Sequence, residues 1–216
     1  FENETWLYDL RCGLWRKIDG GPPTGRTRHG AVYDSTEHRM IIFGGRYRAG
    51  TSGAYTPYGD TWAFDGNTNT WTKLVNKDSS GINAPTPRKT LAMAYDAAAG
   101  KTILFGGDGL SGHRGDTWVF DGNTNTWEKI LDEDNLGESA PVPRIYHAMA
   151  YDTVLGKTIL FGGRKNDAEL IYYGDTWAFD GSTKTWEKLV DEDEAGQSAP
   201  STRQHHAMVY DTGLGK

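Results

Sequence analysis

One block of sequence recurs along this chain and constrains its fold more than any other feature. The block reads Gly-Asp-Thr-Trp-Ala/Val-Phe-Asp-Gly-x-Thr-x-Thr-Trp and covers residues 59–71, 115–127 and 174–186, with a degenerate copy at 4–15. Its first Trp stands at positions 6, 62, 118 and 177, so the copies are 56, 56 and 59 residues apart. A period of this size predicts an array of similar structural units. Residues shared by every copy are therefore expected to maintain the fold.

Each period contains four short apolar segments, which we label a to d in chain order. None has helical length, and each is bounded by Gly, Asp, Asn, Thr or Pro, so all are predicted to be strands. Segment a covers residues 30–33, 92–95, 148–151 and 207–210; segment b covers 40–43, 103–105 and 159–161; segment c covers 6–8, 62–64, 118–120 and 177–179; segment d begins at Trp15, Trp71, Trp127 and Trp186. Four strands per repeat of this length indicate the blade of a β-propeller.

The side-chain pattern within the segments supports stacked blades. Alternation puts His147, Met149 and Tyr151 on one face of a strand and two alanines on the other, which suits a blade packed between two neighbours. Residues 186–189 alternate apolar and charged side chains, as expected of an outer strand with one face in water.

These residues resemble the kelch repeat. A Gly-Gly pair ends segment b, an aromatic residue precedes the Trp of segment d by seven positions, and Arg-x-x-His leads into segment a, except that Leu91 replaces His in the second copy. The sequence of these motifs is most similar to prokaryotic kelch repeats and to the central-domain blades of galactose-oxidase-like proteins. The repeat residues expected to be structural are Gly44, Gly45, Gly106, Gly107, Gly162 and Gly163, with Trp15, Trp71, Trp127 and Trp186.

The predicted fold class is all-β: a kelch-type β-propeller of four-stranded antiparallel blades, about four in this chain, with one closing strand missing. We expect one domain over residues 1–216, with repeats at about 1–59, 60–115, 116–174 and 175–216. The chain starts in segment c and ends after segment a, so a shared closing blade would lack segment b. Three explanations stay open: a longer parent chain, a strand outside the given residues, or two copies that assemble into a larger ring.

Composition excludes some classes of partner. The formal net charge is −6, which argues against a nucleic-acid partner because phosphate binding needs a basic face. No apolar run is long enough for membrane insertion. Cys12 is the only cysteine, so neither an intrachain disulfide nor a cysteine metal site is expected. We expect an extracellular or cell-surface location, with the cytoplasm as the alternative.

Several motifs that suggest chemistry have a structural explanation. Residues 107–112 fit Gly-x-Gly-x-x-Gly, but a strand follows where a dinucleotide site needs a helix. The acidic runs of the d–a loops make Asp132, Asp134, Asp191 and Asp193 weak Ca²⁺ candidates, although the spacing lacks a full calcium loop. The Arg-x-x-His residues are expected to bond neighbouring loops rather than a metal. No cofactor is expected.

The b–c loops differ in length and sequence between repeats, and variation on a constant scaffold is where recognition usually resides. In peptide-binding kelch propellers these loops share one face with the residue two positions after the repeat Arg. The resemblance therefore implies a ligand-binding face. Its candidate residues are Arg28, Arg46, Tyr47, Arg48, Thr90, His113, Arg114, Tyr146, Arg164, Lys165, Tyr172 and His205.

The function expected is a non-catalytic binding module that recognises a protein, a peptide or a glycan, with arginines contacting acidic groups and tyrosines stacking. Self-association that completes the ring is a further expectation. One alternative is a structural protein of a surface layer or filament. Another is a copper enzyme like galactose oxidase, which needs a Tyr–Cys crosslink; Cys12 lies in a c–d turn, at the outer edge of a blade.

Overall fold

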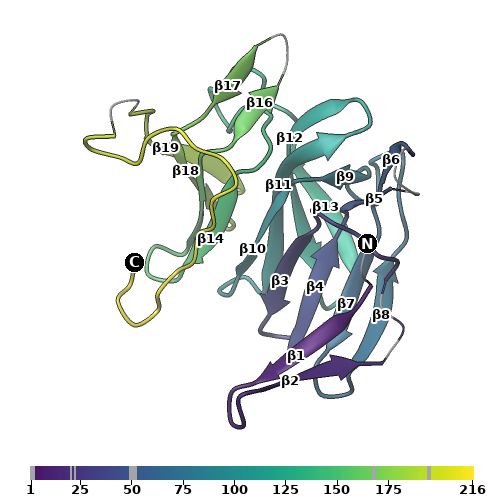
Figure 1. The fold of residues 1–216 in the computed structure, drawn as a ribbon. Coiled ribbons are helices and arrows are strands. Elements are labelled where there is room, and N and C mark those ends of the chain that lie inside the picture. Colours follow the sequence, from purple (N-terminus) through teal and green to yellow (C-terminus); the bar gives the residue numbers. More distant parts are fainter. Residues whose placement is uncertain (1–2, 20, 22, 49–52, 167–168, 194–195) are drawn as a thin grey trace.

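The computed structural model describes residues 3–19, 21, 23–48, 53–166, 169–193 and 196–216. These residues form strands joined by turns, in six antiparallel sheets (Figure 1). Among the residues described, no helix offers the length and apolarity needed to cross a membrane.

Three of the sheets contain a four-stranded blade, and a two-stranded half-blade precedes them. The half-blade is β1 (Thr5–Asp9) and β2 (Leu14–Ile18). Blade 1 is β3 (Gly30–Asp34), β4 (Arg39–Phe43), β7 (Thr61–Asp65) and β8 (Thr70–Val75). Blade 2 is β10 (Ala92–Asp96), β11 (Lys101–Gly109), β12 (Gly112–Asp121) and β13 (Thr126–Leu131). Blade 3 is β14 (Ala148–Asp152), β15 (Lys157–Phe161), β18 (Thr176–Asp180) and β19 (Thr185–Val190). The prediction of four-stranded antiparallel blades is confirmed.

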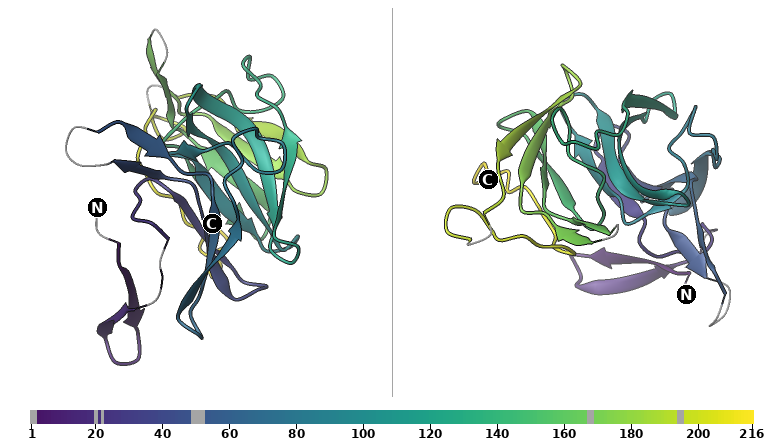
Figure 2. Two further views of the ribbon diagram at one scale, coloured as in Figure 1. Left: turned by 90° about the vertical axis from the view of Figure 1, so that its right-hand side faces the viewer. Right: turned by 90° about the horizontal axis from the view of Figure 1, so that it is seen from above.

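The blades stand side by side in chain order and form an arc. Seen from above, the sheets surround a common centre, and the two ends of the chain lie on opposite sides of the arc (Figure 2). The first strand of each blade is innermost, since β10 contacts both β3 and β14. This is the arrangement of a β-propeller sector.

The b–c connections, which we treated as loops of different length, are β-hairpins. In blade 1, β5 (Arg46–Arg48) pairs with β6 (Tyr55–Pro57), and in blade 3, β16 (Arg164–Asn166) pairs with β17 (Leu170–Tyr172). In blade 2 the long strands β11 and β12 continue past a bulge into the hairpin, and β9 (Arg88–Lys89) pairs with β11. All three hairpins project from the same end of the arc (Figure 1). The glycines of residues 107–112 belong to the hairpin between β11 and β12. A strand follows them here, not the helix that a dinucleotide site needs.

The predicted strand at residues 207–210 does not form. This last segment a has no ladder partner among the described residues, whereas β3, β10 and β14 each pair with the segment b that follows. A strand is stable only when its backbone groups are paired, and no segment b follows Tyr210 in the given sequence. Among the described residues, 207–210 therefore belong to no sheet.

The hydrophobic core lies between adjacent blades. One cluster joins blades 1 and 2, and a second joins blades 2 and 3. At each junction the Phe that ends segment b of one blade packs edge-on against the Trp of segment d of the following blade. The pairs are Phe43 with Trp127 and Phe105 with Trp186, both with ring centroids 5.3 Å apart. Such pairs add about 0.5–1.5 kcal/mol to the effect of burial. Trp127 and Trp186 thus pack between neighbouring blades.

The repeat arginines hold each blade together through a buried ion pair. Arg88 pairs with Asp116 at 2.5 Å and Arg144 with Asp175 at 2.5 Å, and both guanidinium groups are almost wholly buried. Arg144 also donates to the carbonyl of Gly162, 3.1 Å away. This carbonyl belongs to the Gly-Gly pair. A Cβ atom on the second glycine, Gly163, would lie 2.8 Å from the carbonyl oxygen of Ile145, which explains why glycine stands there.

The aspartates of the d–a loops hold those loops by accepting backbone hydrogen bonds. Asp134 accepts from backbone amides of residues 136–140, and Asp193 from those of 196, 198 and 199. Asp132 and Asp191 lie at the surface beside Lys129 and Lys188. No group of three or more metal-ligating side chains occurs in the described residues. Asp134 and Asp193 thus stabilise their own loops, and Asp132 and Asp191 lie beside surface lysines.

Candidate binding site at the inner rim

The residue two positions after each repeat Arg lies on the innermost edge of the arc. These residues are Arg28, Thr90, Tyr146 and His205, and all four have left-handed backbone, with φ between 58° and 61°. The backbone amides of Thr90, Tyr146 and His205 each donate to the carbonyl of the preceding residue of the series, over 2.9, 3.2 and 3.1 Å. We call this hydrogen-bonded series the inner rim. It brings together four candidates that lie far apart in sequence.

Tyr146 is the centre of a cluster of side chains on the inner rim. Its ring stacks on His205 with centroids 3.7 Å apart. The guanidinium groups of Arg28 and Arg164 each lie 5.3 Å from its ring centroid, and Arg28 also donates to the Tyr146 hydroxyl. Arg164 comes from the hairpin of blade 3 and is held beside the rim by a bridge to Ile145. Two cations are thereby placed around one aromatic ring.

The inner rim borders a hollow of about 340 Å³. The residues that line it are Arg28, His29, Thr90, Leu91, Tyr146, His147, His205 and His206. Burial lowers the pKa of the His205 imidazole, and the charges of Arg28 and Arg164 lower it further. Burial also lowers the pKa of His147 to about 3, with a contribution from Arg144. The positive charge of the hollow at neutral pH therefore comes from Arg28, with Arg164 nearby at the Tyr146 ring.

The hairpin of blade 1 carries a second cationic and aromatic group. The Arg46 guanidinium lies 3.6 Å from the ring centroid of Tyr55, and that of Arg48 lies 5.2 Å from it. Arg48 also donates to the carbonyl of Gly53 over 2.9 Å. Tyr47, between the two arginines, is 37% exposed. The predicted residues 46–48 thus form one surface with Tyr55, and the bridge between Thr27 and Arg46 places this surface beside Arg28.

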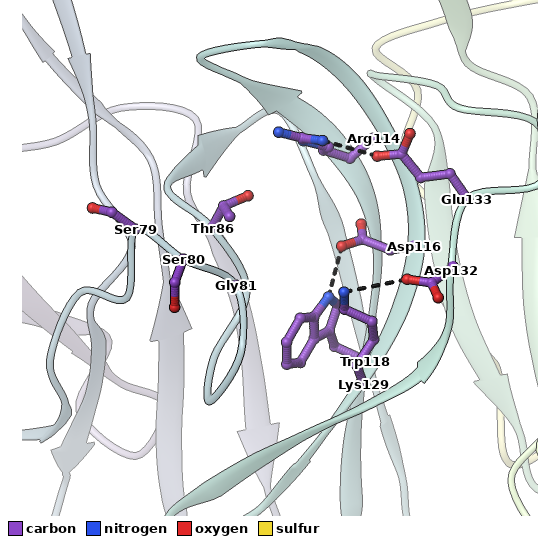
Figure 3. Close-up of a pocket in the computed structure, with 10 residues that line it drawn as sticks. All are labelled: Ser79, Ser80, Gly81, Thr86, Arg114, Asp116, Trp118, Lys129, Asp132 and Glu133. Atoms are coloured by element: carbon purple, nitrogen blue, oxygen red, sulfur yellow. Dashed lines mark hydrogen bonds and ion pairs between the residues drawn. The ribbon is translucent and has the colours of Figure 1, made fainter.

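Arg114 lies away from the inner rim. It pairs with Glu133 at 3.1 Å and lines a groove of about 500 Å³ between blade 2 and the d–a loop of blade 1 (Figure 3). The figure shows the groove's charged groups in contact with one another: Lys129 bonds Asp132, and the indole of Trp118 bonds Asp116. Because these charges are already paired, the groove is a weaker candidate than the inner rim.

The other candidates lie on the hairpins. The ring nitrogen Nδ1 of His113 accepts from the amide of Asn166 over 3.3 Å, which links the hairpins of blades 2 and 3. Lys165 and Tyr172 stand on the hairpin of blade 3, where Tyr172 is 39% exposed. They extend the surface around Arg164 toward solvent.

Sequence reasoning missed Tyr55 and the carboxylate partners of the repeat arginines. Tyr55 lies in a b–c connection that differs between repeats, so no repeat signal marked it. The partners Asp60, Asp116 and Asp175 belong to the recurring block, which supplied the signal. Their spacing from the arginines varies with the hairpin between them, which concealed the pairing.

Comparison with known proteins agrees with this fold. The model of the KLHDC2/KLHL20/DRC7 Kelch-repeats domain matches residues 1–214, so the chain belongs to the kelch-repeat family. Kelch domain-containing protein 1 of Mus musculus is 30% identical over 210 residues, covering 83% of this chain and 48% of that protein. Kelch domain-containing protein 2 of Mus musculus is 27% identical over 187 residues, covering 77% and 43%. Host cell factor 1 of Homo sapiens is 24% identical over 203 residues, covering 86% and 9%.

The chain spans about half or less of the length of these curated relatives. Their kelch repeats support protein binding as the general role of the propeller. They do not indicate which ligand this chain takes.

Proposed function

We propose that this chain is a non-catalytic module that binds an acidic segment of a partner protein at the inner rim. The observation that carries the proposal is the placement of Arg28 and Arg164 around Tyr146, on a hydrogen-bonded rim at the centre of the arc. Neither arginine has a carboxylate partner among the described contacts, in contrast to the repeat arginines that hold the blades. Their guanidinium groups can therefore donate hydrogen bonds to a carboxylate of a ligand.

The geometry favours a peptide over a glycan. Glycan recognition commonly stacks a sugar on an open aromatic face, but Tyr146 already stacks on His205 at 3.7 Å. A peptide carboxylate needs only guanidinium N–H donors, of which each arginine has five. The hairpins around the rim add Arg46 and Lys165, so an extended acidic segment would meet further positive charge.

Selection from an unbiased peptide library tests the proposed ligand class. The immobilised chain is expected to enrich peptides rich in Asp and Glu, with binding that weakens as salt rises. Enrichment of neutral or basic peptides would contradict the proposal. Binding on a glycan array without any peptide binding would favour the glycan alternative instead.

Substitution at the rim tests the residues. With an enriched acidic peptide, Arg28→Gln and Arg164→Gln are each expected to weaken the Kd by about 10-fold or more, since a charge-assisted hydrogen bond contributes about 1.5–3 kcal/mol. Arg11→Gln is the matched control, because it removes the same charge from the exposed β1–β2 turn at the other end of the arc. Equal effects of all three variants would show that only net charge matters, which would refute a site at the rim.

The relatives bear on two further points. Their names tie none of them to secretion or a surface layer, so the cytoplasmic alternative stands as our proposal for location. A non-catalytic role fits their kelch repeats, and Cys12 is exposed in the β1–β2 turn, away from the inner rim where a Tyr–Cys crosslink would be needed.

A further inference from the structure

The hairpin of blade 1 carries a second pair of arginines that no carboxylate neutralises among the described residues. Arg46 and Arg48 stand two positions apart on β5 and therefore share one face of the hairpin, with Tyr55 opposite Arg48 on β6. The centroid of the Tyr55 ring lies 3.6 Å from the Arg46 guanidinium and 5.2 Å from that of Arg48, which holds both cations on this face. The Arg46 Nε is buried without a hydrogen-bond partner. This face therefore offers positive charge and donors to an anionic group.

The cationic face of this hairpin is turned toward blade 2. Pro57, which pairs with Arg46, is the repeat equivalent of His113, since each stands two positions before the recurring block. His113 reaches forward to the following blade, where its Nδ1 accepts from the amide of Asn166 over 3.3 Å. By the same geometry, the face that carries Pro57 and Arg46 is turned toward the hairpin of blade 2.

The opposing surface on the hairpin of blade 2 is built from glycine. Gly109 pairs with Gly112, and Gly112 shares a face with Arg114. Arg114 lines the groove beside the d–a loop of blade 1, so this face looks back toward blade 1. A Cβ atom on Gly112 would meet nothing within 4 Å. The arginines of blade 1 thus face open backbone, whereas the hairpins of blades 2 and 3 are linked by the bond between Asn166 and His113.

The backbone joins the cationic face directly to the inner rim. Thr27 and Arg46 exchange two hydrogen bonds, of 3.0 and 2.9 Å, and Arg28 follows Thr27 in the chain. Paired strands lie about 5 Å apart and each residue advances about 3.4 Å, so the Arg28 backbone is about 6–12 Å from those of Arg46 and Arg48. An extended peptide spans that distance in about two to four residues. One segment can therefore contact both places.

We propose that the acidic segment bound at the inner rim leaves it between the hairpins of blades 1 and 2, where a second acidic residue of the segment binds Arg46 and Arg48. This route rests on the proposed function and adds to it a spacing of about two to four residues between two acidic contacts. On the blade 2 side, Arg114 is already paired with Glu133. The positive charge available to the second acidic residue is therefore that of Arg46 and Arg48.

Double-mutant cycles test the route. The probe is an acidic peptide enriched from the library, whose Asp and Glu residues are changed one at a time to Asn and Gln. Arg48→Gln should weaken the Kd of the parent peptide by about 3–10-fold, and this effect should vanish for one neutralised position. Arg28→Gln should couple to a different position, about two to four residues away. The Tm should stay unchanged, because the described side-chain bonds of Arg48, to Gly53 and Tyr55, lie within its own hairpin.

Two further variants separate the outcomes. Arg11→Gln is the control and should act equally on every peptide of the set, while Lys165→Gln, on the hairpin of blade 3, should not couple to the second acidic position. The route is overturned if Arg48→Gln has the same effect on every peptide, or if the second acidic position couples to Lys165→Gln instead. If Arg28→Gln and Arg164→Gln leave the Kd unchanged, the proposed function itself fails, and the route fails with it.

Discussion

The buried ion pair of blade 3 permits a quantitative prediction. Asp175 receives two hydrogen bonds from Arg144, of 2.5 and 2.9 Å, and a third of 2.7 Å from the indole of Trp177. The Arg144 side chain is only 1% exposed. Asp175→Asn keeps the shape of the side chain but leaves a buried guanidinium without its counter-charge. Breaking one partner of such a pair lowers the free energy of unfolding by about 3–5 kcal/mol.

That loss is large for a domain of this size. Total stabilities are about 5–15 kcal/mol, and each kcal/mol shifts the Tm of a 150–250-residue domain by about 2–4 °C. Asp175→Asn should therefore lower the Tm by about 6–20 °C, measured by calorimetry and checked by urea unfolding at pH 7. The double variant Arg144→Met/Asp175→Leu should recover much of the loss, because an apolar pair leaves no buried charge.

The equivalent position in the last repeat supplies the control. Arg203 occupies the position of Arg144 in the last repeat, is exposed, and bonds the carbonyl of Ser201. Arg203→Gln should change stability by less than about 0.5 kcal/mol, whereas Arg144→Gln should resemble Asp175→Asn. The reasoning is refuted if Asp175→Asn costs less than about 1 kcal/mol, or if the two arginine variants are equivalent.

The pH dependence of this pair follows from its pKa. Burial raises the pKa of the Asp175 carboxyl, but the hydrogen bonds and charge of Arg144, with the hydrogen bond from Trp177, together outweigh burial, so the pKa lies below its usual value. The pair's contribution is then fully present above the unfolded pKa of about 3.9 and is lost as pH falls through the folded value. The difference between wild type and Asp175→Asn should narrow under those acidic conditions.

Three other features give predictions. His147 has a pKa of about 3 in the fold, so unfolding takes up a proton between about pH 6.5 and 3, and the free energy of unfolding decreases as the pH is lowered through this range. His147→Leu, which copies Leu91, should reduce the slope of the free energy of unfolding against pH by up to about 1.4 kcal/mol per pH unit. Gly163→Ala places a Cβ 2.8 Å from the Ile145 carbonyl at φ 98° and should lower stability by more than about 1 kcal/mol in urea unfolding, whereas Gly66→Ala should be nearly neutral. Thr90→Asn should raise the Tm by about 2–4 °C, because a β-branched residue is strained at φ 58° and Asn is not; an unchanged Tm would show that Thr90 carries no such strain.

The blades could be predicted because each strand has its own alternation and the whole pattern recurs. The hairpins could not: β5 and β6 pair Arg-Tyr-Arg with Tyr-Thr-Pro, and a run of three residues is too short for alternation to identify a strand. The strand expected at residues 207–210 has the right alternation but no ladder partner, since pairing depends on a neighbour that local pattern does not reveal.

The sequence predicted which positions form the candidate site, but not which of their side chains touch. Sequence alignment of the repeats identified Arg28, Thr90, Tyr146 and His205 as equivalent and variable. That Arg164 reaches the same ring as Arg28 depends on the bridge between Ile145 and Arg164, which arises from the path of a hairpin. That Arg114 turns outward to Glu133 depends equally on tertiary packing.

At the inner rim, backbone hydrogen bonds hold the arc together, whereas the side chains at the same positions line the proposed binding site. Its hydrogen bonds join backbone amides to backbone carbonyls, so four unlike side chains occupy equivalent places without changing the bonding. A set of variants at these four positions could therefore be searched for new binding specificities on an unaltered scaffold. Asn and Gly would be the least strained starting residues, because both adopt left-handed backbone readily.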